Sequence, residues 1–218
     1  MNAQTITSST FLESGFVLKG VSWQTFKALM AEVGDDRAWR IAYDEGVLEL
    51  RMPLQEHEVP KGLIESFVEA IADELEIEVM KLGALTLERE DLTRAVEPDT
   101  CFYIQNEALV RGRKINLPED PPPDLAIESD YTSSSINKQA LYSALGVPEL
   151  WRYTKKMLII YRRVELGYER CEQSLAFPFL PIAEIPDFIE QSRTIGQRSA
   201  VRLFRQRIRE ILDNQSDT

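Results

Sequence analysis

The chain has 218 residues, of which 44% are hydrophobic and 28% are charged, and its formal net charge at pH 7 is -11. A chain of this length is most economically one domain, and it can bury about 70% of its unfolded surface without needing a disulfide or a structural metal. The acidic balance argues against a general nucleic-acid coat protein, because phosphate binding needs local positive charge. It leaves room for a nuclease with a narrow, metal-lined cleft.

Cysteine usage and the N-terminal composition predict the compartment. Two cysteines, Cys101 and Cys171, fit a reduced intracellular protein better than a secreted one held by disulfides. The first eighteen residues carry no Lys or Arg and no continuous apolar core, so we expect no signal peptide. No run approaches the roughly 20 apolar residues that a membrane span requires. We therefore expect a cytoplasmic protein with no membrane partner.

Periodicity and turn residues predict the elements of the N-terminal half. Residues 1–15 are polar and rich in Ser and Thr, which is typical of a loose tail or an edge strand. Ser22 can cap a helix that Gly34 closes. The tripeptide Asp44-Glu45-Gly46 separates two strand-like runs, which is a hairpin signature. A longer helix is expected over roughly 56–75, followed by short strands at 77–82, 85–88 and 101–104.

The second half of the chain predicts a crossover between two strands. Residues 105–123 lack a clear period and read as a surface loop. The run Thr132-Ser133-Ser134-Ser135 can cap a helix over about 136–145, which Gly146 ends. Strand, helix and strand across 125–153 make a crossover, so these two strands should be parallel. Strands 150–153 and 157–161 form another hairpin. We expect the α/β class, with a mixed β-sheet flanked by helices.

Acidic residues adjoin two of these strands. Asp99 follows Val96-Glu97-Pro98, and the apolar run Leu125-Ala126-Ile127 leads into Glu128 and Asp130. Strand side chains alternate, so Glu128 and Asp130 point to one face. If Asp99 ends a neighbouring strand, three carboxylates converge, which is costly unless a cation binds them. Their hard oxygen ligands suit Mg²⁺ or Mn²⁺ and predict metal-assisted phosphodiester chemistry. The alternative is turn chemistry with surface carboxylates.

The residues around this cluster resemble a known family. Pro98-Asp99, Ala126-Ile127-Glu128, Lys138, Tyr142 and Gly146-Val147-Pro148-Glu149-Leu150-Trp151 resemble the Uma-type endonuclease family (domain of unknown function eight-twenty) of the PD-(D/E)XK nuclease superfamily. The resemblance covers about residues 20–185 and is most specific over 97–153. It implies a restriction-endonuclease-like fold, with Asp99 and Glu128 as ligands of the divalent metal.

One position departs from the superfamily pattern. A lysine is usual two positions after the glutamate, and this chain has Asp130 there. Lys138, in the following helix, can reach back to the site, where its ammonium would orient the attacking water or neutralise the scissile phosphate. The plainer interpretation of Lys138 is a solvated helix lysine. Asp130 can serve as an extra metal ligand.

Other polar residues are weaker candidates. His57 is the single histidine, and the resemblance implies that it lines the site, whereas its position also fits a polar residue at a helix start. Zinc would need more His or Cys ligands than this chain can gather. Glu58, Glu65 or Glu69 on the same helix can supply a further carboxylate. The serine run is interpreted as helix capping rather than as a nucleophile, although its donors can still hold a phosphate.

The C-terminal segment is amphipathic, with one apolar and one basic stripe. The apolar stripe consists of Val201, Phe204, Ile208 and Ile211, and the basic stripe of Arg198, Arg202, Arg205 and Arg209. We interpret the basic stripe as a solvated flank that pairs with Glu190 or Glu210, with nucleic-acid contact as the alternative. The chain then divides into a tail or edge strand at 1–20, a restriction-endonuclease-like domain at 21–190, and a C-terminal helix and tail at 191–218.

The sequence thus predicts a metal-dependent DNA endonuclease that hydrolyses phosphodiester bonds. Its predicted catalytic residues are Asp99, Glu128, Asp130 and Lys138, with His57 lining the site. One rival is a catalytically inactive nuclease fold that serves as a binding or adaptor module. The other is a structural dimerisation domain with incidental surface acids. Whether the protein forms a homodimer is left open.

Overall fold

The computed structural model describes residues 8–12, 15–34, 37–52, 55–83, 85–129 and 134–216, and its strands form two six-stranded sheets. The first sheet is antiparallel throughout and has the order β1 (Ser8–Leu12), β2 (Gly15–Lys19), β4 (Val47–Arg51), β3 (Arg40–Asp44), β7 (Arg94–Val96) and β6 (Leu87–Arg89). The second has the order β12 (Gly167–Cys171), β11 (Met157–Val164), β10 (Glu149–Thr154), β9 (Leu125–Ser129), β8 (Thr100–Tyr103) and β5 (Met80–Leu82). It is mixed, because β9 and β10 run parallel.

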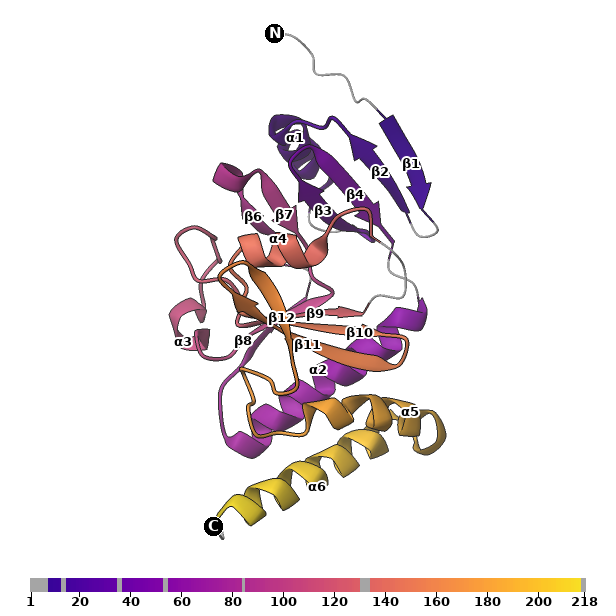
Figure 1. The fold of residues 1–218 in the computed structure, drawn as a ribbon, viewed down its shortest axis with the longest axis vertical. Helices are drawn as coiled ribbons and strands as arrows, with labels where there is room; N and C mark the ends of the chain where they lie inside the picture. Colours follow the sequence, from indigo (N-terminus) through magenta and orange to yellow (C-terminus); the bar gives the residue numbers. More distant parts are fainter. Residues whose placement is uncertain are drawn as a thin grey trace.

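The helices separate and cover the two sheets (Figure 1). Along the long axis of the molecule, α1 covers the first sheet, α4 lies between the sheets, and α2, α5 and α6 cover the far side of the second sheet. The bounds are α1 (Trp23–Val33), α2 (Gln55–Leu75), the short α3 (Glu107–Val110), α4 (Lys138–Ala144), α5 (Ile185–Ile195) and α6 (Gln197–Ser216). Two 3-10 turns, η1 (Glu90–Leu92) and η2 (Ile182–Glu184), complete the described elements.

Strand alternation divides the buried side chains into three apolar layers. The outer layer joins α1 to the first sheet through residues such as Phe26 and Leu48. The middle layer lies between the sheets and contains Ala126 of β9 and Leu141 of α4. The third layer packs the other face of the second sheet, including Ile127, against α2, α5 and α6. Because neighbouring residues of β9 enter different layers, the face of each β9 side chain is fixed.

Local sequence signals explain the N-terminal elements. Ser22 caps α1, with its Oγ accepting a hydrogen bond from the N–H of Thr25 at 3.1 Å, and Gly34 closes the helix with a φ of 68°. The turn between β3 and β4 places Glu45 and Gly46 in the left-handed region, with φ of 47° and 97°, as a tight hairpin requires. The predicted edge strand corresponds to β1, although residues 1–7 lie outside the described ranges.

The α/β class with a mixed, helix-flanked sheet is confirmed, and the structure adds detail that local patterns did not contain. The strands divide between two sheets, a division that depends on pairing between distant segments. The three-residue β7 was not predicted, and the predicted loop at 105–123 contains α3. The crossover is confirmed, since β9 and β10 are parallel with α4 between them in sequence.

The capping of α4 differs from the prediction. The helix begins at Lys138, and Asn137 caps it by accepting a hydrogen bond from the N–H of Ala140 at 3.2 Å. Thr132 and Ser133 lie outside the described residues, and Ser134 has another partner, described below. Across the described part of the chain, no helix is long and apolar enough to cross a membrane.

Candidate functional site

The candidate site lies in the middle layer, where three strands of the second sheet bring polar side chains side by side. Asp99 directly precedes β8, Glu128 lies on β9 and Arg152 on β10. Thr100 pairs with Ile127, and Arg152 pairs with Glu128. Asp99 and Arg152 therefore flank Glu128 from opposite sides.

The side of the sheet on which these side chains lie follows from neighbouring residues of the same strands. Ala126 of β9 and Leu150 of β10 pack into the middle apolar layer. Glu128 and Arg152 follow two positions later on the same strands, so they point toward the same space between the sheets.

Glu128 is the most buried acid of the row, with 2% of its surface exposed. Its two carboxylate oxygens have different partners. The ammonium of Lys138 lies 2.5 Å from Oε2, and the hydroxyl of Tyr142 donates a hydrogen bond to Oε1. Both partners come from α4, so this short helix aims two donors at one carboxylate. The prediction that Lys138 reaches back to the acidic site agrees with this geometry.

Asp99 lies close enough to act on Glu128 electrostatically. Its Oδ2 accepts a hydrogen bond from the backbone N–H of Ser129 at 2.7 Å, which ties it to the end of β9. Burial raises the pKa of Glu128, and the Asp99 carboxylate adds to the rise, while Lys138 and Tyr142 oppose it. Burial also raises the pKa of Tyr142 well above its usual range, so this hydroxyl remains a donor.

A pocket of about 320 Å³ opens beside Glu128. Two cations, Lys138 and Arg152, contribute to its wall, together with the polar residues Ser134, Asn137 and Gln139. The apolar part of the wall comes from Ile136 and Leu150. The pocket thus joins a buried carboxylate to a wall rich in hydrogen-bond donors.

A second buried glutamate, Glu49, approaches this pocket from the first sheet. Its carboxylate accepts hydrogen bonds from the Ser134 hydroxyl at 2.9 Å and from the Ser135 N–H at 2.8 Å, and Arg51 Nε lies 2.5 Å from its Oε1. Sequence reasoning missed this residue. In the sequence, Glu49 is an acid between two leucines of a predicted strand. This pattern predicts a solvent-facing side chain unless both faces of the sheet are covered.

The donor set fits a magnesium-type ion. Asp99 and Glu128 offer carboxylate oxygens, and Mg²⁺ is usually held by one or two carboxylates together with water and substrate phosphates. Within the ranges described above, no group of three or more His, Cys, Asp or Glu residues is placed to hold a metal. The predicted third acid, Asp130, and the side chain of His57 lie outside the described residues, so their roles stay predictions.

The other acids near the Pro-Asp steps have structural partners. Asp124 accepts hydrogen bonds from the backbone N–H groups of Ile104 and Asn106, at 2.7 and 3.0 Å, and so fixes the turn after β8. Glu97 binds Arg37 and also accepts from the Thr86 hydroxyl at 2.7 Å. These two acids have structural roles, whereas Asp99 belongs to the candidate site.

The glutamates of α2 also have partners outside the site. Glu65 and Glu69 pair with Lys81 of β5, at 3.5 and 2.6 Å, and Glu58 pairs with Lys61 at 3.5 Å. None of the three contacts Glu128 in the hydrogen bonds and ion pairs of the described residues. Glu49 is instead the additional carboxylate beside the pocket.

Two arginines of the basic stripe pair with α2, which lies beside α6 on the far side of the second sheet (Figure 1). Arg205 and Arg209 each approach Glu74 to 2.7 Å. The predicted partners differ, because Glu190 binds Lys156 and Arg193, and Glu210 binds Arg207. Arg205 and Arg209 therefore link α6 to α2.

Comparisons with known proteins agree with this architecture. The chain is similar to the crystal structure of a "putative nuclease belonging to DUF820" from Anabaena variabilis ATCC 29413, with a TM-score of 0.51 and 16% sequence identity, over 83% of this chain and 99% of that one. At this identity the likeness concerns the fold. No curated protein matches the chain. Residues 23–195 match the Uma2 family, which is described as "Putative restriction endonuclease". This match covers most of the sequence, and the chain therefore belongs to the Uma2 family.

Proposed function

We propose that the protein is a metal-dependent endonuclease that hydrolyses phosphodiester bonds of DNA. The observation that carries the proposal is the contact between Lys138 and Glu128 beside Asp99. Two carboxylates and an ammonium on adjoining elements are the groups that metal-assisted phosphate hydrolysis needs. Family membership supports a nuclease, and the DNA substrate and metal dependence are inferences from this chemistry.

Each residue has a distinct part in the proposed reaction. Asp99 and Glu128 would hold Mg²⁺ or Mn²⁺, which supplies Lewis-acid stabilisation of the phosphate oxygens when bound. Lys138 orients the water that attacks phosphorus in line and stabilises the charge that develops there. Tyr142 holds the Glu128 carboxylate in place. Asp130 and His57 remain predicted accessory groups.

One observation favours a second candidate, a non-catalytic binding module with a nuclease fold. Both carboxylate oxygens of Glu128 have protein donors, from Lys138 and Tyr142. A glutamate held in this way is satisfied without a metal, as it would be in a fold that has lost turnover. Metal binding and strand cleavage separate the two candidates.

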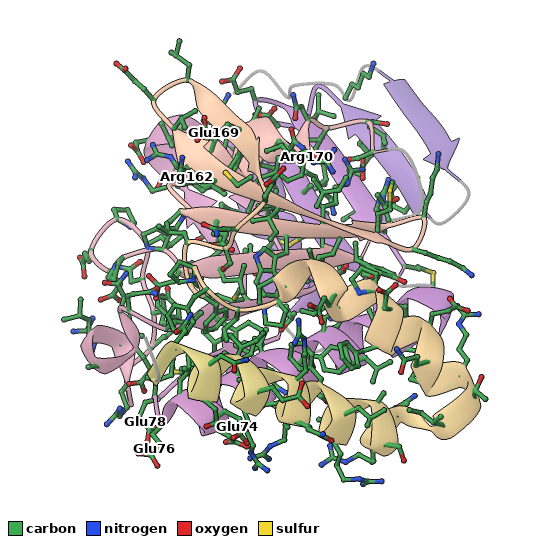
Figure 2. All side chains as sticks on the ribbon, turned by 60° about the horizontal axis from the view of Figure 1, so that its bottom comes forward. Glu74, Glu76, Glu78, Arg162, Glu169 and Arg170 are labelled. Atoms are coloured by element: carbon green, nitrogen blue, oxygen red, sulfur yellow. The ribbon has the colours of Figure 1, made fainter. Side chains whose placement is uncertain are left out.

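The test is nicking of supercoiled plasmid with Mg²⁺ or Mn²⁺ and with EDTA. Asp99→Asn and Glu128→Gln should abolish nicking by removing metal ligands. Lys138→Met should reduce it strongly while leaving metal affinity largely intact. Glu169→Gln is the matched control, since Glu169 lies on the exposed hairpin of β11 and β12 and pairs there with Arg162 (Figure 2).

The outcomes distinguish the candidates. Metal-dependent nicking that Glu128→Gln abolishes and Glu169→Gln retains would support the nuclease. Folded protein that binds metal or DNA but never cuts would support the binding module. Activity that survives Glu128→Gln would indicate a contaminating nuclease and contradict the assigned residues.

A further inference from the structure

The row of side chains across the second sheet has opposite charge at its two ends. On one side of Glu128 stands the Asp99 carboxylate, and on the other stands the Arg152 guanidinium, one strand away in direct register. Neither the family resemblance nor the proposed roles of Asp99, Glu128 and Lys138 use Arg152. The role of Arg152 therefore needs a separate explanation.

The pocket lies on the Arg152 side of this row. Arg152 and Lys138 both line it, and Asn137 and Ser134 add neutral polar groups. Its volume of about 320 Å³ is ample for a phosphate group with part of a sugar. A guanidinium offers a planar fork of donors that matches two oxygens of a phosphate, whereas an ammonium acts as a compact point charge. The two cationic side chains thus line one pocket in a chain whose net charge is -11.

Each half of the row suits a different ion. The Asp99 carboxylate on the β8 side attracts a divalent cation, while the Arg152 guanidinium on the β10 side would repel it. The β10 side instead attracts an oxyanion, and Glu128 lies between the two. This arrangement separates a metal half from a phosphate half along a single sheet.

We propose that Arg152 is a substrate-binding residue that holds the non-bridging oxygens of the substrate phosphodiester in this pocket, opposite the metal half of the site. The inference deepens the proposed nuclease function and rests on it for the identity of the substrate. It also gives the bound substrate a direction, because the phosphate would lie over β10 and face the metal ligands on β9 and next to β8. Lys138, between the halves, can serve the attacking water.

The first arm of the test uses inorganic phosphate as the probe and needs no turnover. Thermal melts with increasing phosphate, at constant ionic strength, should show stabilisation of the wild type. Arg152→Met should lose most of that shift. Arg162→Met is the matched control, because Arg162 sits on β11, pairs with Glu169 and lies half exposed away from the pocket (Figure 2). Arg152→Lys keeps the charge and should retain part of the shift.

The second arm measures binding of a labelled DNA oligonucleotide in Ca²⁺, which replaces the catalytic metal and prevents cleavage. Arg152→Met should weaken binding roughly tenfold, as expected for loss of one charge-assisted phosphate contact. It should also lower the slope of log Kd against log salt by roughly one unit. In cleavage assays its KM should rise with kcat nearly unchanged, whereas Lys138→Met should lower kcat.

The results separate this inference from the proposed function. If the wild type cuts DNA but Arg152→Met matches Arg162→Met in affinity and salt slope, the role of Arg152 is wrong and the nuclease stands. If phosphate stabilises the wild type through Arg152 but no DNA is cut, the anion site stands and the nuclease is wrong. If Arg152→Met fails to fold, Arg152→Lys and Arg152→Gln carry the test, and equal phosphate shifts and DNA affinities in those two variants would overturn the inference.

Discussion

The ammonium of Lys138, at the first position of α4, lies 2.5 Å from Oε2 of Glu128, next to the last residue of β9. The two residues are ten positions apart in the sequence, one on a strand and the other at the start of a helix. In the proposed nuclease, this contact is our candidate for the function of the lysine that the family resemblance leads one to expect two positions after the acid.

Tyr142→Phe should lower the stability of the protein and slow the proposed reaction without removing any proposed metal ligand. The hydroxyl of Tyr142 donates to Glu128 Oε1 and is fully buried, so its loss leaves a buried carboxylate oxygen without that donor. We expect a loss of about 1–3 kcal/mol in the free energy of unfolding, measured by urea denaturation. Plasmid nicking should slow but persist. A variant as stable as the wild type would contradict the structural importance of this hydrogen bond.

Glu49→Gln should loosen the link between the first sheet and the segment that precedes α4. Glu49 is 1% exposed and accepts from both Ser134 and Ser135, with Arg51 beside it. An amide would place donors against donors and leave Arg51 near a neutral group, so we expect a loss of about 1–3 kcal/mol in unfolding free energy.

A kinetic measurement tells whether the effect of Glu49 reaches the pocket. Because Ser134 lines that pocket, Glu49→Gln should lower plasmid nicking by more than Ser134→Ala does. The control is Glu88→Gln, since Glu88 lies on β6 of the same sheet and forms a partly exposed pair with Lys27 of α1. Equal activity of Glu49→Gln and Glu88→Gln would count against coupling between the first sheet and the site.

Glu149 predicts a specific pH dependence of stability. Burial raises the pKa of this carboxyl, while donors from Ser174, Trp151 and the backbone of residues 175–176 oppose the rise. The folded protein therefore binds this proton more tightly than the unfolded chain. The contribution is fully present below the ordinary value near 4.5 and is lost as the pH rises through the folded-state pKa.

Comparison with Glu149→Gln isolates this contribution. The variant cannot titrate at this position, so the difference in unfolding free energy, wild type minus variant, should fall by up to about 1.4 kcal/mol per pH unit within that window. Urea denaturation at intervals of pH provides the measurement. Parallel curves for the two proteins would show that the pKa of Glu149 is not raised in the folded state.

Neutralising two arginines of α6 should affect packing more than nucleic-acid binding. Arg205 and Arg209 both pair with Glu74 of α2. Their hydrogen bonds to the Glu74 carboxylate lower its pKa. Arg205→Met with Arg209→Met should lower the free energy of unfolding only slightly, because these pairs are partly exposed. DNA affinity should stay unchanged within error. A clear drop in affinity would revive the interpretation of this stripe as a nucleic-acid contact.

Local signals predicted the elements well where one residue type determines the backbone. Ser22 and Gly34 bound α1, and the turn at Glu45 and Gly46 forms as predicted, because caps and tight turns depend on neighbouring residues. The division into two sheets and the hydrogen-bond partner of Ser134 could not be predicted from local sequence patterns. Both depend on contacts across the fold, and the Glu49 carboxylate lies 85 positions from Ser134.

The candidate site was predicted in part for the same reason. Asp99 precedes β8, Glu128 lies on β9 and Lys138 begins α4, and the structure brings these three residues together. Arg152 carried no such signal, because an arginine in a strand is ordinary. Only the register of β10 against β9 gives it meaning. Pairing register is a property of the assembled sheet rather than of a short run of residues.

The parallel pairing of β9 with β10 also bears on when the candidate site can exist during synthesis. Its side chains come from residues 99 to 152, and α4 is held against β9 between them. A nascent chain or a truncated product that stops before β10 would lack the strand that completes the pocket. If the proposed nuclease activity is correct, such fragments should be inert toward nucleic acid, and only chains elongated past Thr154 should have the activity.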